Sequence, residues 1–261
     1  MFDARGKAPV QDAPEEASGF RRWLGGNAWR FVLLFVGVLA PLAIFVELAE
    51  EVHELETFHF DVPLLWRMHG WHGPVLDQAV VLITRLGYEW FLIPADVLIP
   101  LALLLWRRWR EACFATLAFA GSALLNLATK QFFQRDRPTL WESIAPEPTY
   151  SFPSGHAMGS MTFACTVILL TWNTRWRWPV LAAAVTFAVL VSASRIYLGV
   201  HYPSDILAGW CAAIAWVIGC YLVLFRQHPP GGARRGSVSP AGARSDGSGP
   251  SREPPMKNDA L

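Results

Sequence analysis

Charged residues are scarce in this 261-residue chain, where Asp, Glu, Lys and Arg together make up only 16%. Soluble domains usually carry about 25% charged residues, so this chain has too few to cover a water-facing surface. Hydrophobic residues account for 53%, which also excludes disorder over most of the length. The formal net charge of +1 gives no reason to expect nucleic acid as a partner.

Cysteine is also rare, and the four cysteines show no paired spacing. All four lie inside apolar runs, which argues against a disulfide framework or a zinc site. A cleavable signal peptide is not visible either, because the first 30 residues are polar and no apolar core follows the first Met. We therefore expect the first apolar stretch to remain as a membrane anchor.

Long apolar segments and tryptophan are abundant instead. The chain contains 13 Trp residues, and Trp favours membrane interfaces. Six segments approach the length of about 20 residues that crosses a bilayer as a helix. They are Phe31–Ala49, Leu86–Trp106, Ala112–Thr129, Ala157–Trp172, Pro179–Ala193 and Ile206–Phe225. The predicted fold class is all-α, a six-transmembrane helical bundle.

The rest of the chain is predicted to add three simpler parts. Residues 1–30 form a cytoplasmic N-terminal segment, and residues 31–225 contain the six-span membrane domain. Between spans one and two, Glu50–Arg85 mixes aromatic and aliphatic residues with acidic residues and His, which is typical of an amphipathic helix on the membrane surface. Residues 226–261 are rich in Pro, Gly and Ser without one aromatic residue, which predicts a disordered cytoplasmic tail.

Basic residues are distributed unequally across the predicted spans. Sixteen of the 22 Lys and Arg residues lie on the side of the two termini. The positive-inside rule therefore places both termini in the cytoplasm, as expected for a multi-pass protein of the bacterial cytoplasmic (inner) membrane. The other six lie on the opposite, periplasmic face and need a separate explanation: Arg67, Arg85, Lys130, Arg135, Arg137 and Arg195.

Four polar clusters share that outer face, each at the end of a predicted span or in the loop beside it. They are Lys130 to Pro138, Pro153 to His156, Ser194 with Arg195, and His201 to Asp205. Burying such groups in or beside a bilayer is costly, so we expect them to pair with one another or to bind something.

The residue types in these clusters suit a phosphoryl group. Arg binds phosphate oxygens bidentately and Lys as a point charge, and the amides that open a helix after Ser154 favour an anion. One of the two histidines can attack phosphorus while the other protonates the departing oxygen. Asp205, four residues after His201, can hold the proton on one ring nitrogen and leave the other as nucleophile. No Asp/Glu-rich cage or His-x-x-x-His pair is present, so no metal or other cofactor is expected.

The same residues form three motifs that resemble those of the type-2 phosphatidic acid phosphatase superfamily. The motifs are Lys130-x6-Arg137-Pro138, Pro153-Ser154-Gly155-His156 and Ser194-Arg195-x5-His201-x3-Asp205, and the six-helix layout extends the resemblance to about Phe31–Phe225. The resemblance implies a metal-independent phosphatase that works through a phosphohistidine. It implies that His201 is the nucleophile, Asp205 its orienting partner and His156 the general acid. It also implies that the phosphoryl oxygens are bound by Lys130, Arg137, Ser154, Gly155 and Arg195.

Several alternatives stay open at this point. The superfamily includes vanadate-dependent haloperoxidases, but those are soluble and the six predicted spans argue strongly against that activity. The implied partner is a lipid phosphate drawn from the membrane, with undecaprenyl diphosphate preferred over phosphatidylglycerol phosphate or phosphatidate. A protein of another class, a non-catalytic lipid-phosphate binder or transporter, would need only the cations and not the two histidines.

Four further polar residues are interpreted from their surroundings. Arg135 and Asp136 are not required by the motifs and are predicted to be a solvated pair in a loop. Asp96 lies inside the second predicted span, where it either lines a proton or substrate path or, as we prefer, makes a hydrogen bond within the bundle. Asn126 precedes Lys130 by four residues, on the same helix face, and is predicted to support the site.

Overall fold

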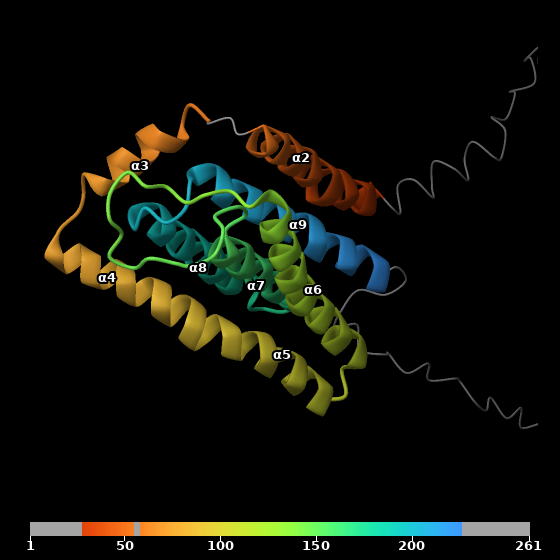
Figure 1. Cartoon of the computed structure of the whole chain (residues 1–261). Coiled ribbons are helices and arrows are strands. Elements are labelled where there is room, and N and C mark those ends of the chain that lie inside the picture. The colour runs from red at the N-terminus through yellow and green to blue at the C-terminus, as the bar shows by residue number, and fades with distance from the viewer. Residues whose placement is uncertain (1–27, 55–57, 226–261) are drawn as a thin grey trace, which may run out of the picture. The chain divides into compact units, whose positions relative to one another are not determined.

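The computed structural model describes residues 28–54 and 58–225, and every regular element in this part of the chain is helical (Figure 1). Most of the predicted N-terminal segment and the whole predicted tail lie outside the described residues. In chain order the elements, with η marking a π-helix, are η1 (Phe35–Leu39), α2 (Ala40–His53), α3 (Asp61–His69), α4 (Pro74–Arg85), η2 (Leu86–Leu92), α5 (Ile93–Leu105), α6 (Trp109–Phe133), α7 (Gly155–Thr171), α8 (Arg177–Tyr197) and α9 (Pro203–Leu224).

Five continuous helical stretches in the described residues are long and apolar enough to cross a membrane. They are Ala28–His53, Pro74–Leu105, Trp109–Phe133, Arg177–Tyr197 and Pro203–Leu224. The segment predicted as the fourth span forms α7, an apolar helix of only 17 residues. The all-α prediction is confirmed, and the chain is a multi-pass integral membrane protein.

The predicted surface helix between the first two spans is only partly correct. α3 is a separate short helix with Leu64 and Trp66 exposed. The segment Pro74–Arg85, in contrast, is not a surface helix, because it continues through η2 into α5 and makes a single stretch of 32 residues. Proline in a helix clashes with the carbonyl four residues earlier. Here the wider π-turn of η2 lies just before Pro94 and makes room for its ring, so α4 continues into α5. The helix is therefore not interrupted where the apolar pattern alone suggested a boundary.

The beginnings of α7 and α9 are held close together at one end of the bundle. A Cβ atom on Gly209 would come within 3.0 Å of the Ser154 carbonyl oxygen and 3.2 Å of the Met158 amide nitrogen. Small residues permit such close approach of helices in membranes. The Ser154 amide also donates a hydrogen bond of 3.1 Å to the carbonyl of Asp205. Two of the three sequence motifs are thereby fixed against each other.

The loop that joins α6 to α7 completes this end of the bundle. Figure 1 shows it at the same end as α3 and the turn from α8 to α9. The ring of Trp141 in this loop packs against that turn, where a Cβ atom on Gly199 would lie 2.6 Å from the indole. Gly199 also has φ +68°, a conformation that suits glycine. The loop, α3 and the turn therefore form one outer layer over the motif residues.

Candidate active site

A single carboxylate, that of Glu147 in the loop between α6 and α7, lies at the centre of the motif residues. Its Oε2 is 2.7 Å from Arg137 Nη2 and 3.7 Å from His201 Nε2. Its Oε1 accepts a hydrogen bond from Arg195 Nη2 and lies 3.5 Å from His156 Nδ1. Four of the predicted site residues, drawn from three separate motifs, therefore converge on one anionic group.

His201 is fully buried just ahead of α9, and its two ring nitrogens face different surroundings. Nδ1 lies 3.5 Å from Asp205 Oδ2 and 3.3 Å from Ser151 Oγ. Nε2 lies 3.1 Å from Arg137 Nη1. Because a guanidinium nitrogen can only donate, Nε2 is the acceptor and the ring proton belongs on Nδ1. This tautomer leaves a lone pair on Nε2, which is the nitrogen that faces Glu147.

The local sequence explains how Asp205 reaches back toward His201. Pro203 starts α9, a position that suits proline because the first-turn amides have no partner within the helix. Asp205 closes a capping box, and its Oδ2 accepts a hydrogen bond of 2.8 Å from the Tyr202 amide. Ser151 Oγ donates a further bond of 2.5 Å to the same oxygen. The carboxylate is therefore held over the residues that precede the helix.

Arg195, near the end of α8, is almost completely buried. Its Nη1 donates a hydrogen bond of 2.7 Å to Thr84 Oγ1, and its Nη2 donates to Glu147. Its Nε is also buried but has no hydrogen-bond partner within the described residues. An orphaned donor of this kind is rare in proteins, and it leaves Nε able to donate to a further acceptor.

Arg137 and Lys130 are tied to the loop between α6 and α7 by backbone carbonyls. Arg137 donates to the carbonyls of Thr149 and Val200, both at 2.6 Å. Lys130, at the end of α6, donates to the Tyr150 carbonyl, which also accepts from Arg137 Nη2 at 3.3 Å. Burial lowers the pKa of Arg137, and the charge of Glu147 opposes that shift. Both cations therefore shape the loop that carries Glu147.

Ser154 and Gly155 open α7 in a different way from the other predicted residues. The Ser154 side chain is buried and caps the helix, accepting from the Ala157 amide at 3.4 Å. Gly155 leaves space for Asn126, whose Oδ1 would lie 3.1 Å from a Cβ atom there. Asn126 Nδ2 donates a hydrogen bond of 3.2 Å to the Pro153 carbonyl, which agrees with its predicted supporting role.

Glu147 is ionised in these surroundings. Burial alone would raise the pKa of its carboxyl group. The positive charge of Arg195, whose Nη2 donates to Oε1, outweighs burial and holds the pKa well below its usual range. The site therefore already binds one anion that belongs to the chain itself.

The prediction that Arg135 and Asp136 form a solvated pair is wrong for Arg135. Asp136 is exposed, but the Arg135 side chain is only 10% exposed. It contacts Asp205 Oδ1 at 2.6 Å and Asp61 Oδ2, from α3, at 3.2 Å. Arg135 pairs with these carboxylates instead of facing solvent, because two buried carboxylates without a positive partner would be far more costly than the ion pairs.

Three residues near the site, Glu147, Ser151 and Asp61, were not predicted from the sequence. Glu147 gives one signal, an acidic residue between two prolines in a loop framed by two motifs. Ser151 lies two residues before the Pro153 motif and resembles any loop serine. Asp61 lies 69 residues before Lys130, and nothing in the local pattern connects it to the site.

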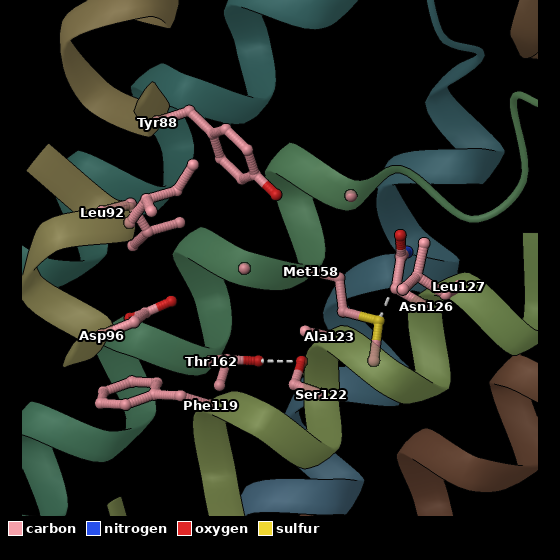
Figure 2. A pocket seen from close by; sticks show the side chains of 13 residues that line it. Tyr88, Leu92, Asp96, Phe119, Ser122, Ala123, Asn126, Leu127, Met158 and Thr162 are labelled. Carbon is pink, nitrogen blue, oxygen red and sulfur yellow. Dashed lines mark hydrogen bonds between the residues drawn. The ribbon is translucent and has the colours of Figure 1, made fainter. Parts of the chain in front are cut away.

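Two cavities flank His156. The first, which we call the polar cavity, has a volume of about 210 Å³ and is lined by Thr84, Arg85, Glu89, Glu147, His156 and Arg195, among others. The second, which we call the membrane cavity, has a similar volume of about 210 Å³ and lies between α5, α6 and α7 (Figure 2). Tyr88 lines the membrane cavity and stacks on the His156 ring at a centroid distance of 4.0 Å. The Tyr88–His156 pair therefore connects the linings of the two cavities.

Asp96 lines the membrane cavity, as Figure 2 shows. Its Oδ1 is buried and has no hydrogen-bond partner in the described part of the chain. The preferred interpretation of Asp96, a hydrogen bond within the bundle, is therefore not what the structure shows. On the opposite side, Ser122 and Thr162 satisfy each other through a hydrogen bond of 2.7 Å.

Comparison with known proteins agrees with this geometry. Residues 111–229 match the model of the PAP2 superfamily. The chain is 30% identical over 195 residues to an undecaprenyl-diphosphatase of Sulfolobus acidocaldarius, an alignment that covers 72% of this chain and 86% of that protein. It is 33% identical over 145 residues to phosphatidylglycerophosphatase B of Bacillus subtilis, covering 52% of this chain and 70% of that protein.

A solved structure supports the same assignment. The crystal structure of a transmembrane PAP2-type phosphatidylglycerolphosphate phosphatase from Bacillus subtilis superimposes with a TM-score of 0.60 at 26% identity. The superposition covers 69% of this chain and 93% of that one. The chain therefore belongs to the PAP2 superfamily of membrane lipid phosphatases, hydrolases that act on phosphate esters and anhydrides.

Proposed function

We propose that this phosphatase removes a terminal phosphate from a lipid phosphate or polyprenyl diphosphate through a phosphohistidine on His201. Undecaprenyl diphosphate is the preferred substrate, with phosphatidylglycerol phosphate and phosphatidate as alternatives. The names of the two relatives support the first two of these lipids.

One observation carries the proposal: the position of the Glu147 carboxylate. Its Oε2 faces His201 Nε2 at 3.7 Å, and its Oε1 faces His156 Nδ1 at 3.5 Å. Arg137 and Arg195 bind the same two oxygens. A phosphoryl group that displaces this carboxylate would lie between the two histidines, with two guanidinium groups on its oxygens. That is the arrangement that nucleophilic attack and leaving-group protonation require.

The chemical steps follow from the ring nitrogens. His201 Nε2 attacks phosphorus, and an N–P bond forms as the P–O bond to the leaving group breaks. His156 gives a proton to the departing oxygen. In the second step His156 takes a proton from water, which attacks the phosphohistidine and releases inorganic phosphate. Asp205 and Ser151 stay on the Nδ1 side of His201 and stabilise the positive ring during the first step.

The cations and the start of α7 bind the phosphoryl oxygens in this account. Arg195 has a buried Nε free to donate to an oxygen, and Arg137 presents the edge that now holds Glu147. Lys130, which shares the Tyr150 carbonyl with Arg137, adds a further positive charge near the phosphoryl group. The amides at the start of α7, after Ser154 and at Gly155, favour an anion by their orientation. These donors bind the phosphoryl oxygens more tightly as negative charge develops on them in the transition state.

The lipid chain lies in the membrane cavity, which opens between α5, α6 and α7. In this placement the phosphate passes the Tyr88 ring into the polar cavity, while the chain lies along the apolar part of the lining, which includes Leu92, Phe119 and Leu127. We include α7 as a sixth, short span, because its first turn holds site residues that belong at the membrane surface. A short hydrophobic stretch is accommodated by polar ends that carry the helix to the surface.

The positive-inside asymmetry supports the proposal that the site lies on the outer face of the cytoplasmic membrane, with both termini inside. In this topology residues 31–225 are the catalytic membrane domain, and the segments before and after it are cytoplasmic. A phosphatase on that face could act on lipid carriers in the outer leaflet.

The proposal is tested by phosphate release from a panel of purified lipid phosphates in detergent micelles, with and without a chelator. The expected result is release from at least one lipid at the same rate in both conditions, and none from the His201→Gln variant. No release from any lipid phosphate would overturn the proposed function and favour a binder or transporter. Complete loss with chelator would overturn its metal-independent chemistry.

A further inference from the structure

Arg135 is held by the two carboxylates that face it. Nη1 lies 2.6 Å from Asp205 Oδ1 and donates to Ser204 Oγ at 2.8 Å. Nη2 lies 3.2 Å from Asp61 Oδ2. The guanidinium carbon also lies 4.2 Å from the centre of the Tyr202 ring, which covers it. The donors of Arg135 are thus directed at α3 and the start of α9, and within the described residues they make no hydrogen bond to Glu147.

Asp61 connects α3 to the same point. Its side chain is 1% exposed, and its Oδ1 accepts a hydrogen bond of 2.9 Å from the Ser204 amide. Its Oδ2 accepts a bond of 2.6 Å from Ser204 Oγ. Burial raises the pKa of Asp61, while Ser204 and the positive charge of Arg135 oppose that rise. A carboxylate from a distant helix therefore caps the first turn of α9, a role that local residues usually fill.

The two oxygens of Asp205 have separate partners as a result. Oδ1 is taken by Arg135, while Oδ2 receives Ser151 and the Tyr202 amide and faces His201 Nδ1. With one oxygen pinned on each side, the carboxylate cannot rotate away from the imidazole. Arg135 is in turn fixed by Asp61, so the chain of contacts runs from α3 to the proposed nucleophile.

We propose that Arg135 and Asp61 are positioning residues for the His201–Asp205 pair, a role that rests on the proposed phosphohistidine chemistry. Neither residue belongs to the three motifs found in the sequence. They act by holding Asp205 so that the proton stays on His201 Nδ1 and the lone pair of Nε2 points at phosphorus. Neither binds the substrate.

The test measures kcat, KM and the rate of phosphohistidine formation for Arg135→Gln, Arg135→Lys and Asp61→Asn. A displacement of about 1 Å in a reacting group can cost about 10²-fold in rate. We expect Arg135→Gln to lose about 10²-fold in kcat and in phosphohistidine formation, with KM unchanged. Arg135→Lys keeps the charge but not the planar fork, so it should fall between wild type and Arg135→Gln. Arg67→Gln is the matched control: Arg67 is an exposed arginine on α3, the helix that carries Asp61, and the variant should behave like wild type.

A double variant separates this role from simple stabilisation. If Asp61 acts through Arg135, adding Asp61→Asn to Arg135→Gln should cause no further loss in kcat, because residues of one network are not additive. Thermal unfolding is followed in parallel. A loss of kcat that only tracks the fraction of unfolded protein would make the role structural and overturn the proposal.

The remaining outcomes also discriminate. A rise in KM with unchanged kcat in the Arg135 variants would make Arg135 a substrate-binding residue. Wild-type rates in all variants would show that Asp205 needs no such support. Either result, with phosphohistidine still formed on His201 in the wild type, would overturn the positioning role and leave the proposed function intact. Absence of phosphohistidine from the wild type would instead reject the proposed function, and the positioning role with it.

Discussion

Arg137 Nη2 lies 2.7 Å from Glu147 Oε2, so a guanidinium group proposed to bind substrate is occupied by a carboxylate of the same chain. The substrate must displace this carboxylate before it can reach His201. Glu147→Gln removes the competing charge but keeps the shape of the side chain. We expect it to lower KM for a lipid phosphate by about tenfold, which corresponds to ~1.4 kcal/mol of binding free energy.

Glu142→Gln is the control for that variant. Glu142 lies in the same loop, and among the described residues it is not a hydrogen-bond or ion-pair partner of Arg137 or Arg195. Steady-state kinetics on both variants give KM and kcat separately. An unchanged KM for Glu147→Gln, or a rise, would show that Glu147 helps substrate binding rather than competing with it.

The competition should also be independent of pH over a wide range. The pKa of Glu147 lies well below its usual value, so the carboxylate stays charged in the folded protein until the solution is strongly acidic. A carboxylate with a depressed pKa keeps its ion pairs above that value and loses them only as pH falls through it. The ratio of KM for wild type to KM for Glu147→Gln should therefore stay constant from about pH 5 to pH 8. A ratio that falls toward 1 near pH 5 would show that Glu147 is protonated there and that its contacts are weaker than the geometry indicates.

Much of the site could be predicted from the sequence, because its residues lie at helix ends. His156, Arg195, His201 and Asp205 each begin or end an apolar segment, and alternation of the spans brings such ends to one face. Glu147 could not be placed in this way. It lies in a loop with no periodicity, and its contacts depend on the path of the chain between Arg137 and His156.

The fold shows the same limit at its second span. The predicted span starts at Leu86, but the helix begins at Pro74, because the few polar residues between them, such as Asp77 and Arg85, do not interrupt a mostly apolar helix. Asp61 and Arg135 were missed or misread for a related reason. Their charges are buried by helices that are distant in the sequence, so local composition suggested solvent where tertiary packing supplies partners.

The membrane cavity gives a prediction on substrate length. Ala123 on α6 lines it, and Ala123→Phe should fill part of the space proposed for the lipid chain. We expect KM for a long-chain substrate to rise about tenfold, or ~1.4 kcal/mol, while a short-chain, water-soluble analogue keeps its KM. Leu124→Phe is the control, since the neighbouring Leu124 is 67% exposed and does not line this cavity. Equal effects of Ala123→Phe on both substrates would place the lipid chain elsewhere.

The proposed topology is tested by cysteine labelling in intact cells. The four native cysteines are free and can be replaced by Ser to give a background without reactive thiols. A single cysteine in the Thr139–Tyr150 loop should then react with an impermeant maleimide from outside. One placed between Arg107 and Glu111 should react only after the membrane is made permeable. The reverse pattern would put the site in the cytoplasm.

The loss of kcat caused by removing His156 should depend on the leaving group of the substrate. His156→Ala removes the proposed general acid, whose assistance is typically worth about 10²–10⁴-fold. A monoester such as phosphatidate must expel an alkoxide and needs that proton, whereas a diphosphate expels a better leaving group. We therefore expect a larger loss of kcat on monoester lipids than on diphosphate lipids. Equal losses on both would mean that His156 mainly positions the phosphoryl group.

The central claim is that the phosphoryl group is carried on His201, and direct trapping of that intermediate tests it. The His156→Ala variant is mixed with a lipid labelled in its terminal phosphate, quenched in base, digested and mapped by mass spectrometry. His156 is also proposed to activate the water that breaks the N–P bond, so the intermediate should accumulate. The account predicts phosphohistidine on the peptide that contains His201, and no label in His201→Gln. Turnover by His201→Gln, or label on any other residue, would contradict it.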